Sequence, residues 1–108
     1  MQKAEKGHTE LTTEAVLERL SAEKQKLSQR FGITALGLFG SFARGEATAT
    51  SDIDLVIDFP PGTPQLSEKK QALRDYLVSV FGRSVDLCRL KYVRNVFRGY
   101  IEEDLIYV

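Results

Sequence analysis

Apolar positions along this chain follow two spacings, one typical of helices and one typical of strands. From Thr12, a good N-cap residue, apolar side chains recur at helical spacing as far as Phe31. A second helical stripe follows Thr63 and Pro64, which suit a cap and a first helical residue, and it stops at Gly82. Three apolar residues spaced four apart predict one more helix near the carboxyl end: Val93, Phe97 and Ile101.

Three shorter segments have the pattern of strands. Residues 33–39 are a short apolar run between glycines, which is typical of a buried strand. Residues 52–59 alternate, so we expect aliphatic side chains on one face and carboxylates on the other. Residues 84–88 repeat that alternation over a shorter span. Residues 41–44 fit a single helical turn, and residues 105–108 form a short apolar tail.

This order of elements predicts an α/β (α+β) domain, with about four helices packed on a three- to four-stranded mixed sheet. The length of 108 residues suits one domain, so we expect residues 12–108 to form it behind a flexible polar leader, residues 1–11. With 43% apolar and 28% charged residues, the composition is that of a soluble globular protein. No apolar run approaches the ~20 residues of a membrane span, and the first residues do not resemble a signal peptide. We therefore expect a cytoplasmic protein without membrane contact.

Charge and composition narrow the chemistry. Fifteen Lys and Arg balance fifteen Asp and Glu, so no overall positive field exists to hold nucleic acid stably. One cysteine, Cys88, and one histidine, His8, exclude a disulfide framework and a Cys/His zinc site. They also make a Ser-His-Asp arrangement improbable. We read His8 as surface and Cys88 as a core or near-core residue. Any catalysis must come from carboxylates, hydroxyls and backbone amides.

A pair of carboxylates on one predicted strand is the first candidate for chemistry. Asp52 and Asp54 leave the same face, with Cα atoms roughly 6.6 Å apart. Two such charges repel each other unless a cation lies between them, and magnesium prefers oxygen ligands of this kind. Asp86, on a third strand, would complete a triad if that strand neighbours the first. Asp58 lies about 13 Å along the strand, too far to bind the same ion.

The second candidate is the dipeptide Gly40-Ser41, where an apolar strand turns into a short helix. Glycine allows a phosphate close to the backbone, and the amides and hydroxyl there can donate hydrogen bonds to it. The segment has neither the Walker sequence nor the spacing of a dinucleotide fold. Arg44, one turn further on, would add a cation. The combination of this bend with the spaced carboxylates is rare enough by chance to favour a metal–nucleotide site.

These residues carry a family resemblance. The segments GSFARG (residues 40–45) and SDIDL (residues 51–55) resemble the signature of the DNA polymerase β superfamily of nucleotidyltransferases. The chain is most similar to the minimal nucleotidyltransferases, over residues 33–108. The resemblance implies a small palm-like fold in which Gly40 and Ser41 hold the β- and γ-phosphates of a nucleoside triphosphate. It also implies that Asp52, Asp54 and Asp86 bind two magnesium ions.

The resemblance further implies a reaction and a partner. Members transfer a nucleotide by in-line displacement at the α-phosphate, with pyrophosphate leaving. In this subfamily the protein is typically the antitoxin of a HEPN-domain ribonuclease toxin, which it neutralises by transferring AMP from ATP to a toxin tyrosine. A chain with no room for separate polymerase subdomains fits a protein acceptor better than a primer.

Two alternatives stay open at this point. A non-catalytic antitoxin would block its partner by binding alone, through the apolar tail at residues 105–108 and through Arg94 and Arg98, which share a helical face. A transferase acting on a small hydroxylated molecule is the other alternative. Enzymes of that kind usually carry a second helical domain, which this chain lacks.

Overall fold

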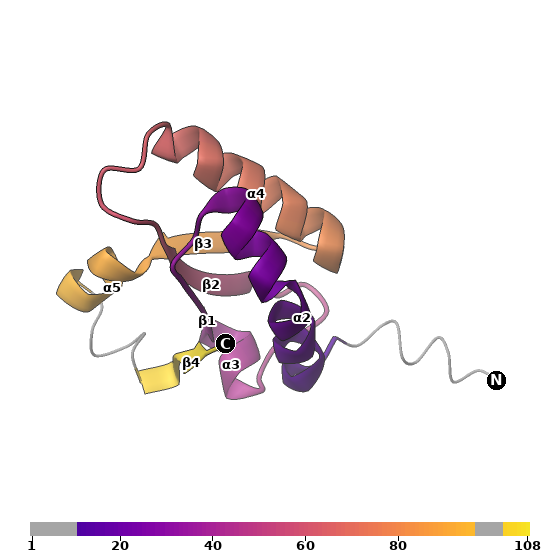
Figure 1. Ribbon diagram of the computed structural model, residues 1–108. Coiled ribbons are helices and arrows are strands. Elements are labelled where there is room, and N and C mark those ends of the chain that lie inside the picture. Colours follow the sequence, from indigo (N-terminus) through magenta and orange to yellow (C-terminus); the bar gives the residue numbers. More distant parts are fainter. Residues whose placement is uncertain (1–10, 97–102) are drawn as a thin grey trace.

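The computed structural model describes residues 11–96 and 103–108, which form a four-stranded sheet with helices packed on it (Figure 1). The elements in chain order are α2 (Thr13–Phe31), β1 (Ala35–Phe39), α3 (Gly40–Arg44), β2 (Ile53–Asp58), α4 (Leu66–Phe81), β3 (Val85–Arg89), α5 (Leu90–Val96) and β4 (Ile106–Tyr107). The strand order is β3-β2-β1-β4, with β2 and β3 parallel and the other pairs antiparallel. The predicted α+β class and mixed sheet are confirmed.

Several predictions fall on residues outside the described part of the chain. They include His8, the helical positions Phe97 and Ile101, and Arg98; the side chain of Arg94 is not described either. Most of the expected leader also lies there. Leu11 is the last residue of the predicted leader, but in the structure it packs against the main core.

The first helix forms as its sequence predicts. The Thr12 hydroxyl caps α2 by accepting a hydrogen bond from the Ala15 amide at 3.0 Å. At the other end Gly32 adopts φ +77°, and its amide donates to the Ser28 carbonyl. Four apolar side chains of α2 at helical spacing are buried: Val16, Leu20, Leu27 and Phe31.

The start of the second long helix differs from the prediction. Thr63 does not cap it, because its hydroxyl donates to the Pro60 carbonyl at 2.6 Å and so closes a turn instead. Helix α4 begins at Leu66, and Gln65 precedes it in the left-handed region with φ +53°. Thr63 therefore belongs to the turn that Pro60, Pro61 and Gly62 begin, and it is not part of the helix.

The main core lies between one face of the sheet and helices α2 and α4. Along β2, Ile53, Leu55 and Ile57 are fully buried, as their alternation predicts. They pack with Leu73 and Leu77 of α4 and with the apolar stripe of α2. This layer leaves the opposite face of the sheet available for α5 and for the polar side chains.

The alternation of residues 52–59 predicts a charged face of the strand opposite the core. In the structure this face is only partly charged. Val56 is completely buried on it, beneath Leu90 and Val93 at the start of α5. Val56 stands between Asp54 and Asp58 in the strand, so the carboxylates of these two residues lie on either side of a small second core. Val56, Leu90 and Val93 form this small core, which we call the Val56 plug, and it separates two polar regions of the sheet face.

The apolar tail is a strand. Residues Ile106 and Tyr107 of β4 pair with Leu38 and Gly37 of β1, and the Val108 amide donates to the Leu36 carbonyl. A Cβ at Gly37 would lie 2.7 Å from a Leu105 methyl carbon and 3.2 Å from the Ile106 carbonyl. Glycine at this position therefore allows β4 to approach β1.

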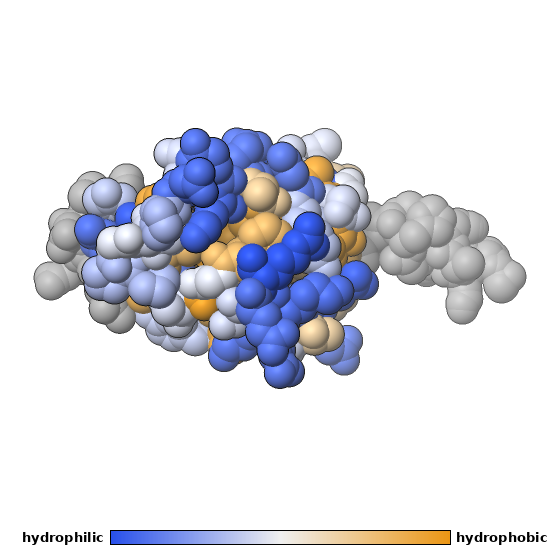
Figure 2. Space-filling view, turned by 45° about the horizontal axis from the view of Figure 1, so that its top comes forward, coloured by the Kyte–Doolittle hydropathy of each residue, from blue (hydrophilic) through white to orange (hydrophobic). Residues whose placement is uncertain are grey.

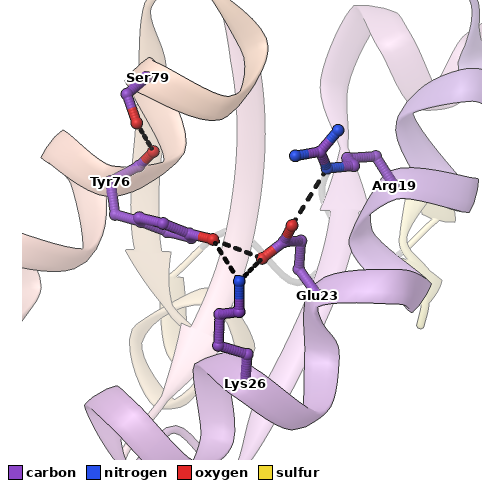
Figure 3. A network of polar contacts seen from close by, with 5 residues as sticks. All are labelled: Arg19, Glu23, Lys26, Tyr76 and Ser79. Carbon is purple, nitrogen blue, oxygen red and sulfur yellow. Dashed lines mark hydrogen bonds and ion pairs between the residues drawn. The ribbon is translucent and has the colours of Figure 1, made fainter.

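A polar network joins α2 to α4 (Figure 3). Glu23 is 7% exposed, and its carboxylate accepts hydrogen bonds from the Tyr76 hydroxyl at 2.6 Å and from Arg19 Nε at 3.1 Å. The Lys26 ammonium lies 3.8 Å from the same carboxylate. The Tyr76 hydrogen bond, opposed by burial and helped by Lys26 and Arg19, lowers the pKa of Glu23. The buried charge is thus matched by donors from both helices.

The surface is predominantly polar. Seen with the α4 side turned forward, it shows hydrophilic clusters on either side of a limited apolar area (Figure 2). Among the described residues, the large hydrophobic side chains that are exposed are Val78, Tyr92 and Tyr107. None of the helices in residues 11–96 and 103–108 combines the length and apolar character needed to cross a membrane.

Candidate active site

Asp54 and Asp86 lie side by side because β2 and β3 are parallel and in register. Their Cα positions are direct partners in the ladder. The next residues along each strand, Leu55 and Leu87, are also partners and point into the main core. Because side chains alternate along a strand, both carboxylates leave the other face of the sheet. From the sequence, Asp86 belongs to the site only if its strand neighbours that of Asp54, and β3 does pair with β2.

Gly40 brings the chain directly against Asp54. It is the first residue after β1, and its φ of +77° lies in the left-handed region. A Cβ at this position would lie 3.1 Å from the Asp54 carboxyl carbon and would overlap one of its oxygens. Phe39, just before it, is the register partner of Asp54. Only glycine fits this bend, and Ser41 follows it in the first turn of α3.

Asp52 is exposed and lies just before β2, at the end of a compact turn. Within this turn the Thr48 amide donates to the Ser51 hydroxyl at 2.7 Å, and the Ser51 amide donates to the Thr48 carbonyl at 3.1 Å. In residues 11–96 and 103–108, no three Asp, Glu, His or Cys side chains are already grouped closely enough to hold an ion. The structure pairs Asp54 with Asp86 and leaves Asp52 further out.

The electrostatics of Asp54 reflect this neighbourhood. Partial burial, followed by the negative charges of Asp86 and Asp52, raises the pKa of Asp54 to about 6, and only Arg44 opposes the shift. The raised pKa means that the ionised form of Asp54 is disfavoured in this structure, and a bound cation would stabilise that form. Both other candidate carboxylates are therefore close enough for their charges to act on Asp54.

Arg44 has carboxylate partners within the protein. Its Nε lies 2.9 Å from Glu46 and its Nη1 lies 2.9 Å from Asp104. The side chain is 44% exposed. The phosphate contact that the sequence predicts for Arg44 stays a prediction. In the structure the guanidinium joins the end of α3 to the segment before β4, and its charge lowers the pKa of Asp54.

Asp58 and Cys88 have other surroundings. Asp58 accepts hydrogen bonds from Arg89 Nε and Nη2 at 3.0 and 2.8 Å and from the Lys91 amide at 3.2 Å. It belongs to a structural ion pair at the far side of the Val56 plug, in keeping with our leaving it out of the site. Cys88 is half-buried, and burial raises the pKa of its thiol. A thiol of this kind is unreactive at neutral pH.

The donor set fits magnesium. Asp54 and Asp86 supply hard oxygen atoms on one face, Asp52 lies nearby, and no histidine or thiolate needs to take part. Magnesium commonly takes only one or two carboxylates and completes its shell with water and substrate phosphates. The site therefore does not require a preformed three-carboxylate cage.

One residue beside the site has no motif to mark it. Arg83 donates from Nη1 to the carbonyls of Ser51 and Thr48 at 3.0 and 3.2 Å, and its guanidinium lies over the Phe42 ring. In the sequence it is a single arginine after Gly82, with no spacing that points to a role. Only the tertiary contact between two loops reveals it.

Comparison with known proteins agrees with this geometry. The nucleotidyltransferase domain model matches residues 20–108. A Thermococcus cleftensis protein named "Protein adenylyltransferase MntA" is 36% identical, over 91% of this chain and 97% of its own length. A Methanocaldococcus jannaschii protein named "Putative protein adenylyltransferase MJ1379" is 38% identical, over 90% of this chain and 98% of its own.

A solved structure shares the fold. Its title is "Structure of putative minimal nucleotidyltransferase", and it superimposes with a TM-score of 0.73 at 28% identity, covering 93% of this chain and 99% of that one. The fold and the family match identify a nucleotidyltransferase. This chain belongs to the nucleotidyltransferase domain family, and its fold is that of a minimal nucleotidyltransferase.

Proposed function

We propose that this chain is an antitoxin that transfers AMP from Mg-ATP to a tyrosine hydroxyl of a HEPN-domain ribonuclease in the cytoplasm, and so inactivates it. Two kinds of support stand behind the proposal. The similar proteins named above are protein adenylyltransferases by name. The carboxylates of Asp54 and Asp86 also leave the same face of the sheet, beside the bend at Gly40.

The observation that carries the proposal is the junction of Gly40 with the Asp54–Asp86 pair. A nucleoside triphosphate that contacts the backbone at Gly40 and Ser41 would have its phosphates directly beside the Asp54 carboxylate. Phosphate oxygens and carboxylates repel each other, so a divalent cation between them is required. The bend and the pair therefore favour the same ligand, a metal-bound triphosphate.

The residues have distinct parts in the proposed reaction. Gly40 and Ser41 hold the β- and γ-phosphates, while Asp52, Asp54 and Asp86 orient the metal and the acceptor. Magnesium, when bound, neutralises the phosphate charge and favours ionisation of the attacking hydroxyl. The hydroxyl oxygen forms a bond to the α-phosphorus, the bond to the β-phosphate oxygen breaks, pyrophosphate leaves and the hydroxyl proton is released.

An intact-mass experiment tests the proposal. The purified chain is incubated with Mg-ATP and a HEPN-domain protein encoded by a neighbouring gene. We expect the HEPN protein to gain the mass of one or more AMP groups, and we expect Asp54→Asn and Asp86→Asn to abolish the gain. Asp75→Asn, which removes an exposed carboxylate from α4, is the matched control and should retain it. An unmodified HEPN protein with the wild-type chain would refute the proposal.

Inhibition by binding alone is the competing function. The apolar tail no longer favours it as a free docking segment, because Ile106 and Tyr107 pair with β1. Exposed Tyr92 and Tyr107 offer it some apolar surface. If Asp54→Asn protects cells from the toxin as well as the wild type does, binding is sufficient and transfer is not the inhibitory step.

A further inference from the structure

The guanidinium of Arg83 is in contact with three separate points of the chain. Its Nη1 donates to the Ser51 carbonyl at 3.0 Å and to the Thr48 carbonyl at 3.2 Å. Its central carbon lies 5.1 Å from the centre of the Phe42 ring, which is 1% exposed. Arg83 itself lies in the short connection between α4 and β3. One side chain thus links that connection to the turn before β2 and to α3.

Two of these contact points, Ser51 and Phe42, are next to candidate site residues. Ser51 directly precedes Asp52, and Phe42 directly follows Ser41. Arg83 is three residues before Asp86 in the chain. The Ile53 amide donates to the Ser84 carbonyl at 3.0 Å, so the backbone beside Arg83 is already tied to the start of β2.

From these contacts we propose that Arg83 is a positioning residue that sets the place of Asp52 relative to Asp54 and Asp86. The inference rests on the proposed role of these carboxylates in metal binding. Asp54 and Asp86 are placed by the sheet ladder, whereas Asp52 precedes the strand and has no such constraint. The turn that carries Asp52 is held by its own hydrogen bonds and by Arg83.

Arginine has the chemistry for this position and lysine has it only in part. A planar guanidinium lies flat on an aromatic ring while its N–H groups donate in the plane, towards carbonyl oxygens. An ammonium group can donate to one or both carbonyls, but it does not stack in the same way. The Arg83→Lys variant should therefore hold the turn less well than arginine and better than glutamine.

The first test uses the metal-free protein and does not depend on activity. Amide hydrogen exchange is measured on the segment 45–52 in wild type, Arg83→Gln and Arg83→Lys. We expect faster exchange in this segment for Arg83→Gln and an intermediate rate for Arg83→Lys, with β2 unchanged. Arg30→Gln is the matched control, because Arg30 also lies over aromatic rings, at 5.0 Å from Phe31 and 5.1 Å from Tyr76, but on the far helices.

The second test measures metal affinity with Mn²⁺ as the probe, by electron paramagnetic resonance with ATP present. We expect the Mn²⁺ dissociation constant to rise about tenfold in Arg83→Gln and less in Arg83→Lys, since a small displacement of one ligand weakens a site strongly. Transfer assays should show a fall in kcat of about tenfold or more, with a smaller change in the KM for ATP.

These readouts separate the inference from the proposed function. If wild type transfers AMP but Arg83→Gln matches it in exchange, Mn²⁺ affinity and kcat, the positioning role is wrong and the function stands. If wild type transfers nothing, the exchange and Mn²⁺ data still decide the role of Arg83. Should Arg83→Gln fail to fold, Arg83→Lys decides: unaltered exchange and affinity would overturn the inference.

Discussion

Asp54 and Asp86 are register partners on two parallel strands, and their carboxylates leave the same face of the sheet. This relationship places two like charges together in a protein whose core is otherwise ordinary. Burial is the main reason that the pKa of Asp54 is raised to about 6, and repulsion by Asp86 and Asp52 adds to the shift. The repulsion makes the arrangement unfavourable for the metal-free fold and favourable for cation binding.

Replacing Asp54 by Asn should stabilise the metal-free protein. A carboxyl group whose folded pKa is raised destabilises the fold at pH values above that pKa, because its charged form is disfavoured there. Because Asp54 is only partly buried and solvent still screens part of the repulsion, we expect a gain of only about 1 kcal/mol in the free energy of unfolding at pH 8. Denaturation in the presence of EDTA measures it, with Asp75→Asn as control. A loss of stability in Asp54→Asn would contradict the claim that the ionised Asp54 carboxylate destabilises the metal-free fold.

With Mg-ATP present, the wild type should become more stable than Asp54→Asn. We expect added Mg²⁺ with ATP to stabilise the wild-type fold by binding the native state, and to stabilise Asp54→Asn much less. The two proteins are compared by thermal denaturation with and without Mg-ATP. Equal increases in Tm for both would show that Asp54 does not take part in the binding of this ligand.

Gly40→Ala should abolish transfer by a steric route. The methyl group would overlap the Asp54 carboxylate, and the left-handed φ adds strain of about 1 kcal/mol. Gly32→Ala has the same φ of +77°, but its added Cβ meets nothing within 4 Å. We expect both variants to lose similar backbone stability, while only Gly40→Ala loses AMP transfer. Equal activity of the two variants would show that close contact with Asp54 is unimportant.

The ion pair of Asp58 with Arg89 should contribute stability that depends on pH. Burial opposes ionisation of Asp58, but the Phe59 amide, Arg89 and the Lys91 amide outweigh it and lower the pKa below the usual 3.8. A lowered folded pKa means that the stabilisation is complete above pH 3.8 and is lost as the pH falls through the lower folded pKa.

Asp58→Asn should therefore unfold more easily than wild type at neutral pH, by about 2 kcal/mol, because Arg89 loses its partner in a mostly buried position. The difference should shrink as the solution is acidified below the folded pKa. Urea denaturation across this pH range measures it. A difference that is independent of pH would show that the charge of Asp58 is not the cause.

Tyr76→Phe should loosen the contact between α2 and α4. It removes the hydroxyl that donates to buried Glu23 and leaves that carboxylate with fewer partners (Figure 3). We expect a loss of about 1–2 kcal/mol in the free energy of unfolding. Tyr107→Phe, at an exposed ring, should cost almost nothing. If the double variant Tyr76→Phe with Glu23→Gln is destabilised by the sum of the single effects, the two groups do not interact.

The sequence was sufficient for the parts of the fold that depend on local pattern. The stripe of α2 and its cap at Thr12 and the aliphatic face of β2 can be predicted from spacing alone. Failures arose where tertiary contacts decided the outcome. Thr63 closes a turn with Pro60, and Val56 is buried because α5, far along the chain, covers it.

The sequence indicates which residues belong to the candidate site but not how they are arranged in space. Spacing predicts Asp52 and Asp54 on one strand, whereas Asp52 lies just before β2 in the structure. The closeness of Asp54 to Asp86 depends on a parallel register that spacing does not contain. The contact between Gly40 and Asp54 depends on the β1–β2 pairing in the same way. Arg83 could not be found at all, since its role arises from a contact between two connections.

The most direct test of the central claim uses ATP labelled either at the α-phosphate or at the γ-phosphate, with the HEPN-domain protein as acceptor. If the Asp54–Asp86 pair binds a metal-bound triphosphate for nucleotidyl transfer, label from the α-position appears on the acceptor and label from the γ-position does not. Asp86→Asn should then show neither. Transfer of the γ-label, or undiminished α-label with Asp86→Asn, would contradict the account.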